Sequence, residues 1–153
     1  MRKILLLLVV FAFPVMGLFA QKSNANYNEA LAKKLHADDL GMKMYVLAIL
    51  KTGNNKVTDK TLRDSLFAGH FANINRLASL KKLIVAGPLE KNDKTYRGIF
   101  ILDVSSIEEA KQLLDSDPTI KQNIFDVEYF NWYGSAALPE YLDAADKIWK
   151  KKP

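Results

Sequence analysis

His70 is the residue whose chemistry and position together point to a functional site. Helical spacing places it on one face with Leu66, Ile74 and Leu77, at intervals of four, four and three residues. The other three side chains are aliphatic, so we expect this face to be buried. An imidazole can transfer protons near neutral pH, and inside a core it needs a polar partner. The question for this chain is which group pairs with His70.

The elements that must position His70 follow from the hydrophobic pattern. Apolar runs between turn residues predict four strands, at 42–51, 83–86, 96–104 and 125–133. Helical spacing predicts two long helices, at 59–82 and from Ser106 through Leu114, and flanking helices at 27–40 and 139–150. Asp59 and Ser106 are expected N-caps, the latter within a capping box. The order β-α-β-β-α-β predicts an α+β, ferredoxin-like plait with extra N-terminal and C-terminal helices.

The first and third strands are apolar on both faces. In a ferredoxin-like plait these strands are central, and the helices cover only one face of the antiparallel sheet. The second face therefore needs its own cover. A second copy of the sheet in a symmetric homodimer is one solution, and the leader and C-terminal helices are the other.

The first 20 residues have the pattern of a secretory signal peptide. A basic start, Met1-Arg2-Lys3, precedes an apolar run to Phe19, and Ala20 offers a cleavage point before a polar segment. An uncleaved N-terminal anchor is the alternative. The expected organisation is a signal peptide at 1–20, a leader segment with a helix at 21–41, the folded domain at 42–137 and a C-terminal helix at 138–153. We expect export to the periplasm or the medium, with no membrane attachment after cleavage.

Composition excludes several classes of site. The chain has no cysteine, which rules out disulfides, thiol nucleophiles and thiolate metal ligands. The formal charge is +5, but the lysines are scattered and no basic stripe with aromatic residues predicts nucleic-acid binding. The only histidines, His36 and His70, give no metal-ligand spacing. We expect neither a metal nor a cofactor.

Several short motifs in residues 42–137 make the chain similar to the YCII-related family of dimeric α/β-barrel proteins. The matching pieces are Tyr45-Val46-Leu47-Ala48, the helix with His70, Val85-Ala86-Gly87-Pro88, Arg97-Gly98, Glu108-Glu109-Ala110, Asp117-Pro118 and Trp132. Each piece alone is weak, and the set is more specific.

The resemblance implies a dimer with stacked sheets and a cleft between helix and sheet in each subunit. It also implies that His70 and Asp117 form a dyad, in which the carboxylate fixes the imidazole tautomer and the other ring nitrogen moves a substrate proton. Related proteins of this barrel class include a dehydrochlorinase of chlorinated hydroxyquinols and muconolactone isomerase. A signal peptide departs from the usual cytoplasmic family member, so a role in cytoplasmic catabolism is not implied.

The remaining candidates each have a structural alternative. Arg97 either anchors an anionic substrate or is an exposed strand residue, and Tyr45 and Trp132 either reach the cleft or pack in the core. Gly69 costs a helix up to about 1 kcal/mol relative to alanine, and tolerance explains it slightly better than the close approach of another group. The chain is thus either a small cofactor-free enzyme or a non-catalytic dimer that binds a small molecule or serves a structural role.

Overall fold

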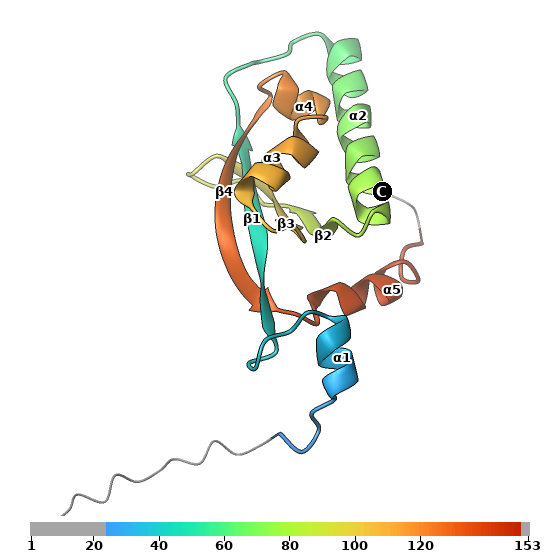
Figure 1. Cartoon of the computed structure of the whole chain (residues 1–153). Helices are drawn as coiled ribbons and strands as arrows, with labels where there is room; N and C mark the ends of the chain where they lie inside the picture. Colours follow the sequence, from blue (N-terminus) through green and yellow to red (C-terminus); the bar gives the residue numbers. More distant parts are fainter. Residues whose placement is uncertain (1–23, 151–153) are drawn as a thin grey trace, which may run out of the picture.

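The computed structural model describes residues 24–150 (Figure 1). The predicted signal peptide at 1–20 lies outside the described residues. Within them, no helix has the length and apolar character needed to cross a membrane.

Four strands form one antiparallel sheet in the order β2-β3-β1-β4. Their bounds are Met42–Thr52 for β1, Leu83–Pro88 for β2, Tyr96–Leu102 for β3 and Phe125–Ser135 for β4. The central pair is β1 and β3, as their two apolar faces predicted. The sheet therefore has the connectivity of the ferredoxin-like α+β plait that the sequence predicted.

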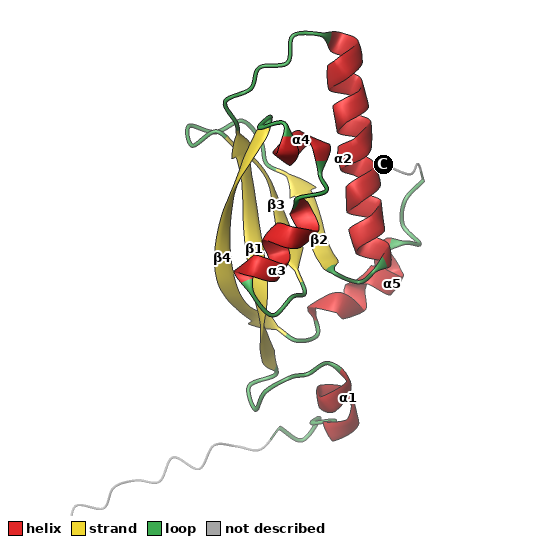
Figure 2. Cartoon of the chain, turned by 45° about the horizontal axis from the view of Figure 1, so that its top comes forward, coloured by secondary structure: helices red, strands yellow, loops and turns green. Residues whose placement is uncertain are grey.

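Three helices gather on one side of this sheet (Figure 2). They are α2 at Lys60–Ser79, α3 at Ile107–Leu114 and α4 at Pro118–Lys121. The main core lies between these helices and the sheet, and its fully buried members are Val46, Ala48, Leu77, Leu102, Ala110 and Leu114. Each helix starts at a carboxylate or hydroxyl cap, provided in turn by Asp59, Ser106 and Asp117.

The predicted capping box of α3 is realised in a modified form. The Ser106 hydroxyl accepts from the Glu109 amide at 3.1 Å, whereas the Glu109 carboxylate reaches one residue further, to the amide and hydroxyl of Ser105. The Ser105 amide, the Lys82 ammonium and the Ser105 hydroxyl lower the pKa of Glu109 to about 2. The carboxylate thus joins the start of α3 to the connection between α2 and β2.

The C-terminal segment covers part of the second face of the sheet. This segment consists of the 3₁₀ helix η1, Leu138–Tyr141, and the single turn α5, Leu142–Ala145. It packs apolar side chains against a small core on that face, and the Tyr141 hydroxyl donates to the Ile84 carbonyl. Elsewhere on the face, Phe130 remains 46% exposed. The C-terminal segment is therefore only a partial cover.

Both flanking helices are shorter than predicted. Helix α1 spans only Glu29–Lys34, and His36 adopts a left-handed conformation with φ 56°, which ends the helix well before residue 40. His36 is consequently an exposed turn residue. At the other end, Lys147 and Ile148 bond to carbonyls three residues back, so the predicted helix at 139–150 does not continue as an α-helix.

Candidate functional site

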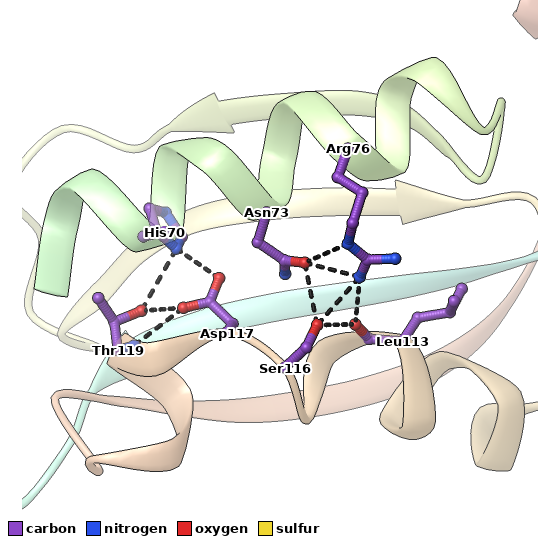
Figure 3. Close-up of polar contacts among 7 residues, drawn as sticks. All are labelled: His70, Asn73, Arg76, Leu113, Ser116, Asp117 and Thr119. Carbon is purple, nitrogen blue, oxygen red and sulfur yellow. Dashed lines mark hydrogen bonds and ion pairs between the residues drawn. The ribbon is translucent and has the colours of Figure 1, made fainter.

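His70 and Asp117 are hydrogen-bonded although they are 47 residues apart in the chain. The distance from His70 Nδ1 to the Asp117 carboxylate is 2.7 Å, and both residues are buried, His70 at 7% exposure and Asp117 at 0% (Figure 3). The imidazole comes from the middle of α2, and the carboxylate comes from the turn that precedes α4. The helix and the turn thus meet over the sheet through this pair.

Asp117 performs two tasks with its two carboxylate oxygens. One oxygen faces His70, and the other accepts from the Thr119 amide at 2.9 Å and from the Thr119 hydroxyl at 2.6 Å, which caps α4. Burial alone would raise the pKa of Asp117, but the hydrogen bonds from His70 and Thr119 outweigh it and leave the pKa below its ordinary value. Asp117 is therefore an ionised acceptor at neutral pH.

The approach of the turn to α2 depends on Gly69. A Cβ atom at this position would lie 2.5 Å from Cγ of Pro118, closer than two carbon atoms can pack. The sequence slightly favoured tolerance of this glycine, and the structure corrects that interpretation. Gly69 allows the proline ring of the Asp-Pro turn to rest on the helix next to His70.

A second set of polar contacts ties the same turn to α2 one helical turn further along. Asn73 Oδ1 accepts from Arg76 at 2.7 Å and from the Ser116 hydroxyl at 3.0 Å, and Arg76 also donates to Ser116 at 3.0 Å (Figure 3). These contacts fix the residue before Asp117. With three donors directed at its oxygen, the Asn73 amide nitrogen is left buried without a partner within the described chain.

The His70 ring is surrounded by four phenylalanine rings. The Phe100 ring is stacked on it at 6.0 Å between centroids, and the three others approach edge-on, at 5.5 Å for Phe125, 5.6 Å for Phe71 and 6.2 Å for Phe67. Two of these rings belong to α2, one to β3 and one to β4. The surroundings of the imidazole are therefore apolar except on the side of Asp117 and Thr119.

His70 also lines a cavity of about 640 Å³ between α2 and the sheet. A volume of this size is typical of small-molecule sites. Besides His70 and the four phenylalanines, its lining includes Leu50, Ile74, Asn75, Pro88, Lys91 and Arg97. The His70 Nε2 atom has no hydrogen-bond partner among the described residues. It is not fully buried either, because the Asn73 amide nitrogen is the only fully buried side-chain polar atom without a partner in this part of the chain. Nε2 is therefore open to the cavity. This nitrogen is the one that a bound molecule can meet.

The other residues expected to bind substrate divide between the two faces of the sheet. Arg97 lines the cavity with His70. Tyr45 and Trp132 lie on the opposite face, where their ring centroids are 5.6 Å apart and the Tyr45 hydroxyl donates to the Ser135 carbonyl at 2.9 Å. Burial raises the pKa of Tyr45 to about 12. The structure therefore places Tyr45 and Trp132 with the core of the second face and away from the cavity.

Sequence reasoning missed the aromatic wall and one cation. Phe67 lies three residues before His70, a spacing that helical geometry places next to it, whereas Phe71 directly follows His70 in the chain. Phe100 shares a strand face with Gly98, but β3 is apolar on both faces, so its sequence does not show which face the helices cover. Lys91 carries no such signal, because it belongs to the connection between β2 and β3. Residues 24–150 contain no group of three or more His, Cys, Asp or Glu side chains that could hold a metal ion.

The chain is similar to proteins that are already known. Residues 44–133 match the model of the YCII-related domain. No curated protein matches the chain. Among solved structures, the chain is similar to the 5-chloro-2-hydroxyhydroquinone dehydrochlorinase of Burkholderia phenoliruptrix AC1100 in complex with 2,5-dihydroxybenzoquinone. The two share 22% sequence identity with a TM-score of 0.41, and the match covers 57% of this chain and 92% of the dehydrochlorinase chain. The YCII-related domain match covers more than half of this chain, and the chain therefore belongs to the YCII-related family.

Proposed function

We propose that this protein is an exported, cofactor-free enzyme in which His70 and Asp117 carry out general acid/base chemistry on a small molecule. The observation that carries the proposal is the different environment of the two imidazole nitrogens. Nδ1 is held by Asp117 at 2.7 Å, and Nε2 faces a cavity of about 640 Å³. A histidine that serves only as packing does not need a free nitrogen in a cavity.

The chemistry follows from the tautomer. Because the ionised Asp117 can only accept, Nδ1 carries the proton and Nε2 has the free electron pair. Nε2 would take a proton from a carbon next to a carbonyl, and the electron pair of the C–H bond would pass to the carbonyl oxygen to give an enolate. Return of the proton at another carbon completes an isomerisation or a lactone rearrangement. Loss of a halide from the adjacent carbon completes a dehydrohalogenation.

The surroundings suit this role. Apolar rings on several sides lower the local polarity around the imidazole, so its electrostatic interactions are stronger than they would be in bulk solvent. The turn that presents Asp117 is fixed at both sides, by Pro118 against Gly69 and by Ser116 against Asn73. The base is thereby held in one orientation before a substrate arrives.

Proton exchange tests the proposal with a panel of compounds, so the substrate itself need not be identified first. A set of small ketones, lactones and hydroxyquinones in D₂O, followed by NMR, should include a compound whose α-protons exchange faster with the protein. We expect His70→Gln to slow that exchange by about 10²-fold or more, the range for a removed general base. His36→Gln is the matched control, since His36 is exposed and outside the cavity. Equal exchange in both variants would contradict the proposal, and binding without exchange would favour the non-catalytic alternative.

We further propose that the uncovered part of the second sheet face forms a homodimer. Support comes from Phe130, which is 46% exposed beside the partly buried Leu47 and Ile49 on a face that the C-terminal segment covers only in part. The mature protein should sediment as a dimer, and Phe130→Lys should make it a monomer with unchanged circular dichroism. Leu62→Lys, at an exposed leucine of α2, should remain dimeric. A monomeric wild-type protein would refute this assembly.

A further inference from the structure

The cavity that contains His70 has a charge asymmetry that its apolar walls do not explain. Two of its lining side chains, Lys91 and Arg97, are cationic and exposed, and the lining includes no aspartate or glutamate. Neither cation forms an ion pair within residues 24–150. By contrast, several other lysines in the structure contact opposite charges, as at Lys51, Lys82 and Lys43. The cavity therefore has a net positive edge.

The positive edge and the imidazole lie at different depths. His70 is 7% exposed, whereas Lys91 and Arg97 are among the exposed residues. Phe100, which stacks on the imidazole, and Arg97 are on the same strand, three residues apart, which corresponds to about 10 Å at roughly 3.3 Å per residue. This odd spacing normally places two side chains on opposite faces, but β3 shifts its register against β1 at Arg97, and both residues line the cavity. A molecule that reaches both His70 and the cations must therefore be elongated. A single ring with a short side chain, or two fused rings, has this length.

We propose that the cavity binds elongated aromatic acids whose anionic group lies at Lys91 and Arg97 and whose ring system extends between the phenylalanines to His70. Arginine presents two parallel N–H donors that match a carboxylate, and lysine adds a second positive charge. The phenylalanine walls favour a flat apolar body. This inference rests on the proposed function, since it names the substrate class for the same cavity and places the carbon acid next to Nε2.

Matched pairs of acids and amides test the charge requirement directly. Isothermal titration at low salt would compare benzoate with benzamide, 4-phenylbutyrate with its amide, and 2-naphthoate with 2-naphthamide. We expect the dissociation constants of the longer acids to be lower than those of their amides by a factor of about ten or more, and a factor of ten corresponds to about 1.4 kcal/mol. The preference should decrease as salt is added, because the cations are exposed.

Variants then assign the preference to the two cations. In Lys91→Gln/Arg97→Gln the acid and the amide should bind equally, whereas Lys94→Gln, in the same connection but not in the cavity lining, should keep the preference. An acid preference that survives in the double variant, equal binding of acid and amide to the wild type, or no binding of any acid at millimolar concentration would overturn the inference. The measurement is binding and not turnover. Charge-selective binding without proton exchange therefore contradicts only the proposed function, and exchange without charge selectivity contradicts only this inference.

Discussion

Asp117→Ala should lower the free energy of unfolding by about 2 to 5 kcal/mol, since a buried donor that loses its acceptor costs about 1 to 3 kcal/mol and the loss of a helix N-cap costs about 1 kcal/mol. The reason is that this carboxylate satisfies three donors at once. His70 Nδ1, the Thr119 amide and the Thr119 hydroxyl all face it in a region with 0% exposure at Asp117 and Thr119. An alanine would leave the Thr119 amide buried without a partner, leave the Thr119 hydroxyl and His70 Nδ1 with only their 3.3 Å contact to each other, and remove the N-cap of α4. Urea unfolding followed by circular dichroism measures the loss.

Asp115→Ala is the matched control, because Asp115 is an exposed aspartate two residues earlier, at the end of α3. It should cost well under 1 kcal/mol, the usual range for a surface substitution away from special features. If the two alanine variants unfold at the same urea concentration, the buried carboxylate does not hold the turn in the way that the distances indicate.

Asp117 should also contribute to the acid sensitivity of the fold. Its pKa in the folded protein is below the ordinary value, so its stabilising contribution is complete above the unfolded pKa and is lost as the pH falls through the folded pKa. Asp117→Asn keeps the shape but cannot titrate. Its stability should therefore depend less on pH below about 4 than that of the wild type. Parallel curves for the two proteins, from urea unfolding at a series of pH values, would contradict this linkage.

The sequence predicts the plait because local signals and the global pattern agree there. The strands, the caps at Asp59 and Ser106 and the buried face of α2 all depend on spacing within one element, which the sequence displays directly. The flanking helices were predicted too long because their ends depend on local backbone geometry that a periodic pattern does not encode. The first helix ends early because His36 adopts a left-handed conformation. The last helix ends early because the hydrogen bonds after Ala144 reach only three residues back.

The candidate site also has parts that the sequence predicts and parts that it does not. The meeting of His70 with Asp117 was expected through the resemblance, because nothing within either segment specifies a partner 47 residues away. The placement of Tyr45 depends on which face of the sheet the helices cover. Both faces of β1 are apolar, so alternation alone could not assign the side of the sheet that holds the cavity. The packing of the helices settles it, because Val46 and Ala48 join the main core beneath them and Tyr45 joins the small core of the other face.

Gly69→Ala should be destabilising by about 1 to 3 kcal/mol, although alanine is the better helix former. The new Cβ would lie 2.5 Å from Pro118 Cγ, and a proline ring cannot rotate away as a flexible side chain can. Insertion of a methyl group into a packed contact costs roughly 1 to 3 kcal/mol, which exceeds the gain of up to about 1 kcal/mol from helix propensity. To relieve the clash the Asp-Pro turn must move away from α2, and this movement lengthens the bond between His70 and Asp117.

Two measurements distinguish this mechanism from a general loss of stability. Ala72→Gly, at an exposed position of the same helix, removes helix propensity without touching the turn. It should lower stability by up to about 1 kcal/mol and leave the imidazole ¹⁵N spectrum of His70 unchanged. Gly69→Ala should instead weaken the downfield Nδ1–H resonance expected for a short bond to a carboxylate. If Gly69→Ala stabilises the protein and preserves that resonance, the proline contact is slack and Gly69 does not set the distance between helix and turn. If Gly69→Ala behaves as expected, the missing methyl group of Gly69 determines how closely the Asp117 carboxylate approaches the His70 imidazole. This explains why glycine, which is unfavourable in a helix, is found beside the candidate base.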